Sequence, residues 1–94
     1  MKPAQIEFTP ALGRLIRDLP PSTKHRVGDA LREIADSPLA GKPLRDDLAG
    51  LRSYRLGGFR IVYQVKGRLI QVVTVGPRRN VYSAAALALK RGDS

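Results

Sequence analysis

The chain contains no cysteine and a single histidine, which excludes a disulfide framework, thiolate chemistry and a metal cluster of ordinary ligand spacing. Its longest uncharged apolar run, residues 84–89, is far shorter than the roughly 20 residues of a membrane-spanning helix. The N-terminal segment also lacks the apolar centre of a secretion signal. We therefore expect a cytoplasmic protein that acts without a metal or another cofactor and does not bind a membrane.

Acidic residues are absent from Leu48 to Gly92, although nine Lys and Arg residues fall in that range. Residues 51–94 hold nine bases against one acid, whereas residues 1–50 hold eight bases against seven acids. Such asymmetry is typical of proteins that bind a polyanion, most often nucleic acid. Seven of the nine bases are Arg, whose planar guanidinium can bind phosphate through two hydrogen bonds. A basic but merely solvated surface would satisfy the composition equally well.

The first half of the chain predicts a strand followed by two helices. Residues 4–8 alternate apolar and polar, as in a half-buried strand. Thr9 can cap a helix that Pro20-Pro21 ends, and Ser22 can cap a second helix that runs to Ser37-Pro38. The turn between these helices is short, so we expect them to form an antiparallel hairpin.

The second half predicts a meander of strands and a final helix. The loop 39–50 is expected to be anchored to the rest of the domain by three leucines that pack against it: Leu44, Leu48 and Leu51. Strands are expected over 52–56, 59–66 and 69–75, joined by glycine-bearing turns. The last of them is apolar on both faces and should have a neighbour on each side, and the alanine-rich helix 79–90 needs a groove in which to dock.

These elements make one α+β domain, residues 1–94. We expect an N-terminal strand, an antiparallel helical hairpin, a three-stranded antiparallel meander that completes a small sheet, and a C-terminal helix. Within the meander, Phe59, Ile61, Tyr63 and Val65 point to one face, which leaves Arg60 on the other. Tyr63 is therefore expected to belong to the core and not to the catalytic site.

Two stretches of the chain carry a resemblance. The segment GKPLRDDLAGLRSYRLGGFRIVYQV (41–65), followed by VGPRRNVY (75–82), resembles the RelE/ParE superfamily of toxins from toxin–antitoxin pairs. The RelE branch of ribosome-dependent mRNA endoribonucleases is the most similar. The shared pattern is an ordered set: a leucine-bearing loop, an arginine-flanked glycine turn, the FRIVY strand, and Gly-Pro-Arg-Arg before a helix that bears a tyrosine. The resemblance covers nearly the whole chain and implies a RelE-like fold.

The expected topology gathers a set of basic side chains and one phenol into a cleft. The predicted catalytic residues leave neighbouring strands and the start of the last helix: Arg55, Arg60, Arg78 and Tyr82. Attack of a ribose 2′-OH on the adjacent phosphate builds negative charge that preorganised guanidiniums can stabilise. The resemblance implies that Arg60 stabilises the phosphate, that Arg78 protonates the 5′-oxygen, and that Tyr82 assists the chemistry or stacks on a base. The products would be a 2′,3′-cyclic phosphate and a 5′-hydroxyl.

Five further bases are expected to contact RNA: Arg52, Lys66, Arg68, Arg79 and Lys90. Of these, Arg79 is expected to contact the nucleic-acid backbone, and for Arg52 and Arg68 a solvated face or diffuse attraction to RNA is the default.

The general base is not assigned by the resemblance. Well-known RelE enzymes carry a pair of lysines before the hairpin, one of which is the proposed base, but here the stretch 52–55 reads Arg-Ser-Tyr-Arg. Arginine does not give up its proton near neutral pH. Tyr82 is the best candidate because nearby positive charge should lower its pKa from about 10. Tyr54, Lys66 and Lys90 are weaker candidates.

The resemblance also implies the partners. These are a cognate antitoxin with a flexible, acidic and amphipathic segment, and the ribosome with mRNA in its A site. The toxin–antitoxin complex is further expected to bind operator DNA. Two alternatives stay open: a ParE-like toxin that poisons DNA gyrase and has no nuclease activity, and an inactive relic that only binds antitoxin and, with it, DNA.

Overall fold

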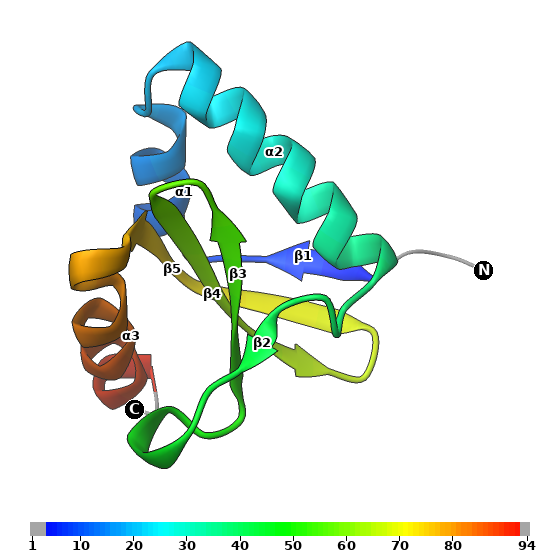
Figure 1. The fold of residues 1–94 in the computed structure, drawn as a ribbon, viewed down its shortest axis with the longest axis vertical. Coiled ribbons are helices and arrows are strands. Elements are labelled where there is room, and N and C mark those ends of the chain that lie inside the picture. The colour runs from blue at the N-terminus through cyan, green and yellow to red at the C-terminus, as the bar shows by residue number, and fades with distance from the viewer. Residues whose placement is uncertain (1–3, 93–94) are drawn as a thin grey trace.

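A single five-stranded sheet, with helices on both faces, forms the body of the molecule (Figure 1). The structure is a computed structural model and describes residues 4–92. In chain order the elements are β1 (Gln5–Glu7), α1 (Pro10–Arg17), α2 (Pro21–Asp36), β2 (Lys42–Pro43), the 3-10 helix η1 (Asp46–Leu48), β3 (Leu51–Leu56), β4 (Phe59–Lys66), β5 (Leu69–Pro77) and α3 (Arg78–Gly92). Within that range no helix combines the length and the apolar character needed to cross a membrane.

The order of strands in the sheet is β1-β5-β4-β3-β2. Strands β3, β4 and β5 form the predicted antiparallel meander, and β1 adds to β5 in parallel. The prediction that β5 has neighbours on both sides is confirmed, and β4 occupies the middle of the sheet. The two-residue strand β2 was not predicted, because it is too short to show an alternating pattern and exists only through its pairing with β3.

The two N-terminal helices follow the predicted boundaries closely, with one exception at a cap. The Thr9 hydroxyl accepts a hydrogen bond from the Leu12 backbone N–H at 3.2 Å, which confirms it as the cap of α1. The prediction that Ser22 caps α2 is wrong, since α2 begins at Pro21 and the cap position is Pro20. Proline at the first helical position has a preset φ and has no backbone N–H to leave unpaired, so the helix starts two residues earlier without a side-chain cap.

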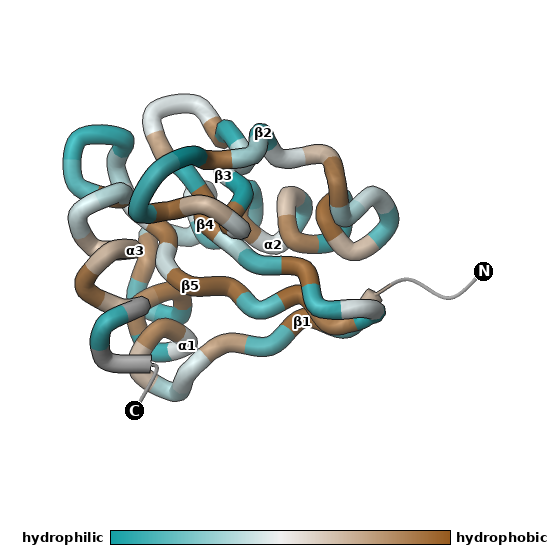
Figure 2. Tube along the Cα trace, turned by 90° about the horizontal axis from the view of Figure 1, so that it is seen from below, coloured by the Kyte–Doolittle hydropathy of each residue, from teal (hydrophilic) through white to brown (hydrophobic). Residues whose placement is uncertain are grey.

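The sheet buries a core on each face. Helices α1 and α2 cover the larger core, whose centre includes Val27, Ile34, Ile61 and Tyr63. Figure 2 shows apolar segments along β5 in the middle of the molecule. The smaller core lies under α3 and consists of Leu51, Val62, Val81 and Ala85, with Leu44 and Leu48 packed against it. The predicted anchoring of the loop by its leucines is thereby confirmed, and small side chains on α3 allow that helix to dock.

The Tyr63 hydroxyl anchors the loop between α2 and β2 through two hydrogen bonds to its backbone. The buried Tyr63 hydroxyl donates to the Pro38 carbonyl at 2.7 Å and accepts from the Gly41 N–H at 2.8 Å. The Arg52 guanidinium donates to the carbonyls of Leu39 and Gly41 in the same loop. A side chain at Gly41 would collide with the Tyr63 hydroxyl, because its Cβ would lie 2.6 Å away. This arrangement places Tyr63 in the core, as predicted, and Arg52 on the α2 side of the sheet.

Candidate functional site

Strand register places two arginines opposite each other on the face of the sheet that α3 covers. Arg60 on β4 is paired with Arg55 on β3 and with Gly76 on β5. Like charges directly opposite each other on antiparallel strands destabilise the sheet. Gly76 leaves space on the other side of Arg60, since a Cβ there would meet no atom within 4 Å. The pair therefore concentrates positive charge where an anion could relieve the repulsion.

Arg60 also carries a donor without an acceptor. Its Nη1 atom is buried and has no hydrogen-bond partner within residues 4–92. A buried donor left unpaired costs about 1–3 kcal/mol, and more when the group is charged. Unpaired buried donors are rare in native proteins. The Arg60 donor is explained if an oxygen atom of an anionic ligand accepts its hydrogen bond.

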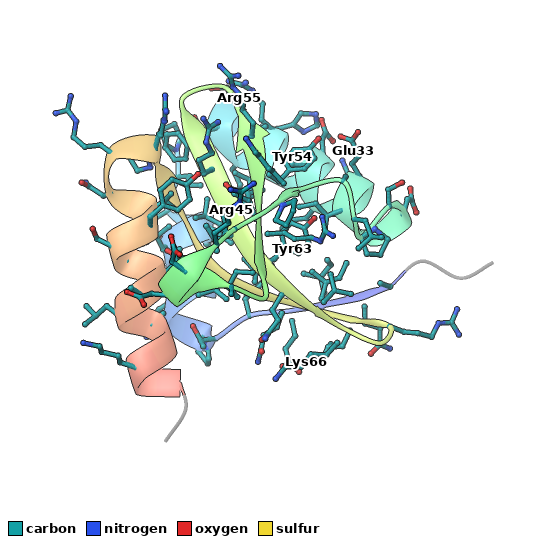
Figure 3. All side chains as sticks on the ribbon, turned by 60° about the horizontal axis from the view of Figure 1, so that its bottom comes forward. Glu33, Arg45, Tyr54, Arg55, Tyr63 and Lys66 are labelled. Carbon is teal, nitrogen blue, oxygen red and sulfur yellow. The ribbon has the colours of Figure 1, made fainter. Side chains whose placement is uncertain are left out.

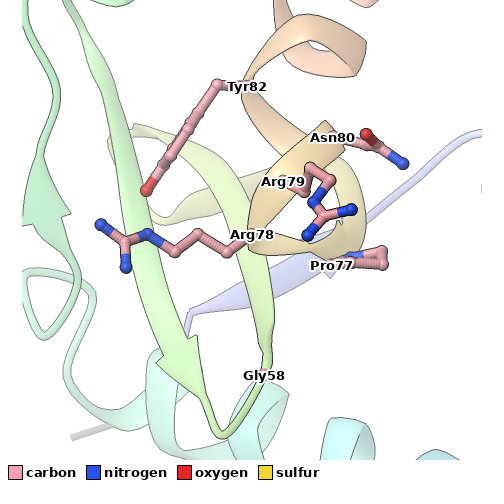
Figure 4. Close-up of a pocket in the computed structure, with 6 residues that line it drawn as sticks. All are labelled: Gly58, Pro77, Arg78, Arg79, Asn80 and Tyr82. Carbon is pink, nitrogen blue, oxygen red and sulfur yellow. The ribbon is translucent and has the colours of Figure 1, made fainter.

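Helix α3 begins at the edge of this charged surface and supplies two further side chains. The Arg78 backbone N–H donates to the Gly58 carbonyl at 3.2 Å, which ties the start of α3 to the β3–β4 turn. In Figure 4 the side chains of Arg78 and Tyr82 extend to the same side, and those of Arg79 and Asn80 point away from them. These residues line a pocket of about 880 Å³, together with Gly58 and Pro77.

The Tyr82 hydroxyl is hydrogen-bonded to Ser53, which lies in the stretch 52–55 where related RelE enzymes carry lysines. Ser53 on β3 is 8% exposed, and its Oγ lies 3.2 Å from the Tyr82 hydroxyl. The Ser53 hydrogen bond lowers the pKa of Tyr82, and partial burial opposes this effect. Arg60, as a nearby donor and a positive charge, and Arg78, as a positive charge, lower the pKa further. The packing of α3 against the sheet creates this contact between residues 29 positions apart, so no local sequence signal could have found it.

Tyr54 lies on the opposite face of the sheet, beside α2. Its hydroxyl donates to the Glu33 carboxylate, as the neighbouring positions in Figure 3 illustrate. This hydrogen bond, with burial and the Glu33 charge, raises the pKa of Tyr54 to about 12. The phenol therefore stays protonated at neutral pH and is a poor general base. Tyr54 is thus excluded from the alternatives considered for that role.

Four of the five predicted RNA-binding residues lie away from the pocket, and only Arg79 lines it. Arg52 holds the loop before β2 through backbone carbonyls. Lys66 and Arg68 flank the β4–β5 turn, about 20 Å from the β3–β4 turn along a strand of this length. Figure 3 shows Lys66 and Arg55 at opposite ends of the sheet. Lys90 is exposed near the far end of α3.

The order of elements and the sheet topology define a RelE-like α+β protein, with an arginine- and tyrosine-lined pocket at the start of its last helix. The family described as "ParE toxin of type II toxin-antitoxin system, parDE" matches residues 6–82. Toxin RelG of Mycobacterium tuberculosis is 32% identical over 84 residues, which are 85% of this chain and 97% of the relative. The chain therefore belongs to the RelE/ParE superfamily of type II toxin–antitoxin toxins.

Solved structures agree with this assignment. The toxin–antitoxin complex RelBE2 of M. tuberculosis contains a chain that superposes with a TM-score of 0.72 at 32% identity, over 81% of this chain and 99% of that one. A free-state mutant of Escherichia coli toxin RelE gives a TM-score of 0.74, over 95% of this chain and 97% of that one. At 23% identity, the second comparison supports the fold alone.

Proposed function

We propose that the protein is a ribosome-dependent mRNA endoribonuclease that inhibits translation. The observation that carries the proposal is the arrangement around Tyr82: a phenol of lowered pKa, bonded to Ser53, with Arg60 and Arg78 close enough to act on its charge. Arg60 contributes a buried donor that lacks a partner within residues 4–92. Cleavage by internal attack requires a group that accepts the proton of the 2′-OH and cationic groups that stabilise the charge on the phosphate oxygens. Tyr82 and the arginines can supply these groups.

In the proposed reaction the Tyr82 phenolate accepts the proton of the ribose 2′-OH. The 2′-oxygen forms a bond to phosphorus while Arg60, with Arg55 beside it, stabilises the charge on the phosphorane oxygens. The bond from phosphorus to the 5′-oxygen then breaks. Arg78 donates a hydrogen bond that stabilises the departing oxygen, this oxygen takes a proton from water, and Tyr82 returns its proton to water. The products are a 2′,3′-cyclic phosphate and a 5′-hydroxyl. By analogy with oxyanion donors, each guanidinium contact made only in the transition state could contribute about 3 kcal/mol.

The proposed partners follow from this role. The relative in the RelBE2 structure is part of a toxin–antitoxin complex, and we propose that a cognate antitoxin likewise binds this chain. A net charge of +9 favours an antitoxin segment that is acidic. The ribosome, with mRNA in its A site, would present the substrate, so the protein would act in the cytoplasm, and the toxin–antitoxin complex would bind operator DNA.

Mapping of mRNA ends by primer extension, after brief induction of the toxin, tests this proposal. We expect new 5′ ends within the translated reading frame, because the ribosome presents only mRNA that lies in its decoding site. A ParE-like gyrase toxin is the competing function, favoured by the description of the matching family. Intact mRNA together with trapped gyrase–DNA cleavage complexes would replace the nuclease proposal with that alternative.

Ser53→Ala is expected to move the ascending limb of the pH–rate profile to higher pH. Loss of the hydroxyl donor destabilises the Tyr82 phenolate, so the pKa of Tyr82 rises and less of the base is present at neutral pH. The rate near pH 7 should fall about tenfold, the usual scale for a hydrogen bond to a charged group. Single-turnover rates between about pH 6 and pH 10 measure the shift.

The exposed Ser83, next to Tyr82 on α3, offers a matched control, and Ser83→Ala should leave the profile unchanged. An unshifted limb in Ser53→Ala would mean that the limb does not report Tyr82.

A further inference from the structure

We propose that Arg26 on α2 binds a phosphate of the same RNA strand that enters the pocket lined by Arg78 and Tyr82. The strand would cross the Gly57-Gly58 turn between β3 and β4 and continue onto the α2 side of the sheet. This inference rests on the proposed function and adds a second contact site for its substrate. Arg26 lies in the first half of the chain, where acids nearly balance bases, so the distribution of charge along the sequence does not indicate a role for it.

Two separate pockets meet at the turn. Gly58 lines the 880 Å³ pocket, and it also lines a smaller pocket of about 240 Å³ with Thr23, Arg26, Leu56 and Phe59. Figure 4 labels Gly58 at the turn, below Arg78. The β3–β4 turn is thus a ridge shared by two hollows, one on each side of it. A chain of linked phosphates that occupies the first hollow can reach the second by passing over this ridge.

The ridge itself has no side chains. Gly57 has a φ of +60°, and a Cβ there would lie 2.8 Å from a guanidinium nitrogen of Arg26. Arg26 therefore lies against the bare backbone of the turn. A Cβ at Gly58 would meet no atom within 4 Å. Two adjacent glycines allow a nucleic-acid backbone to approach the protein backbone closely, and any larger residue would also be strained at Gly57.

Arg26 keeps its charge available to an external anion. Within the described range, 4–92, its side chain makes no hydrogen bond or ion pair. Asp29 and Glu33 line a neighbouring pocket together with Arg26, but neither forms an ion pair with it. Asp29 is paired with Arg32 and lies near His25, and Glu33 accepts a hydrogen bond from the Tyr54 hydroxyl. The smaller pocket has no acidic residue in its lining. An arginine in this state favours a phosphate oxygen, which its fork can bind with two hydrogen bonds.

The chemistry of the smaller pocket fits single-stranded RNA. Phe59 is partly exposed there and lies beside the cation, and a combination of aromatic ring and arginine is common where proteins bind single strands. Ribosomal RNA could supply a phosphate as well. The position of Gly58 in the lining of both pockets favours the substrate strand, because its backbone is already anchored in the larger pocket.

Binding of short oligoribonucleotides to the purified toxin tests the proposal. A 2′-deoxy sugar at the scissile position keeps them intact, and lengths from about two to about eight nucleotides sample the path over the turn. Wild-type affinity should rise with length. Arg26→Ala should bind the dinucleotide like wild type and the longest oligonucleotide roughly fivefold more weakly, with a salt slope lower by about 0.7, the effect of one lost phosphate contact on a single strand.

Lys24→Ala is the matched control, since it removes one exposed charge from the same helix at a residue outside both pockets. It should bind every length within about twofold of wild type, because diffuse attraction from one exposed charge is strongly screened. Equal weakening by both variants would overturn the proposal, as would an Arg26→Ala toxin with wild-type affinity for all lengths. A defect seen only on ribosomes would assign the phosphate to ribosomal RNA instead. If wild type itself bound no oligonucleotide of any length, the path over the turn would be wrong. The proposed ribosome-dependent function would stand, because mapping of mRNA ends tests it separately.

Discussion

Arg60→Ala is expected to reduce mRNA cleavage by about 10²–10³-fold and to relieve the growth arrest that the toxin causes. Arg60 is the guanidinium with a buried, unpartnered donor in the described part of the chain, and its charge acts on Tyr82. A contact made mainly in the transition state should lower the single-turnover rate more than substrate binding. Rates on ribosome-bound mRNA measure the effect, and Arg78→Ala should cause a loss of similar size.

The fold should tolerate both changes. Arg78 is exposed, and removal of Arg60 abolishes a repulsion with Arg55, so the melting temperature and antitoxin binding should stay near wild type. Arg79→Ala is the matched control for Arg78→Ala, because the adjacent side chain points away from Tyr82 in Figure 4. It should lower the rate by about tenfold or less, as expected for a backbone contact. If Arg60→Ala and Arg78→Ala toxins stayed fully active in cells, the nuclease pocket would be misassigned.

Tyr82→Phe is expected to reduce the cleavage rate by about 10²–10⁴-fold, the usual effect of losing a general base. The variant keeps the ring, which packs against the smaller core, and removes only the ionisable oxygen. Affinity for mRNA should therefore barely change. The ascending limb of the pH–rate profile should also disappear, because the group whose lowered pKa defines it is gone.

A comparison with Tyr82→Ala separates catalysis from stacking. If the ring only stacks on a base, the Phe variant would keep most activity and the Ala variant would lose it, since stacking contributes about 1–3 kcal/mol and needs no hydroxyl. A Phe variant that cleaves at the wild-type rate would end the case for Tyr82 as the base. In that event Ser53→Ala should have no effect on the rate either, because the serine is expected to act only through the tyrosine hydroxyl.

Much of the fold could be predicted because local patterns determine it. Alternation in the FRIVY strand places Ile61 and Tyr63 in the core and Arg60 on the other face, and the structure confirms this placement. Glycine-bearing turns delimit the strands of the meander within two residues of their observed ends. The elements that were missed are those with little local signal. They are the two-residue strand β2, which depends on its partner β3, and the start of α2, where two prolines override the capping preference of Ser22.

The class of the protein could be recognised from sequence: one α+β domain, a basic second half with a single acid, and the ordered motifs of the RelE/ParE superfamily. Charge and periodicity are local properties, so they can be read without coordinates. Only the tertiary structure decided which polar groups meet. The packing of α3 on the sheet brings Ser53 to Tyr82, and the packing of α2 places Arg26 against Gly57. On the other face of β3, Arg52 binds the loop before β2 and Tyr54 binds Glu33. Contacts between residues distant in the chain depend on how strands and helices pack, which no short window of sequence encodes.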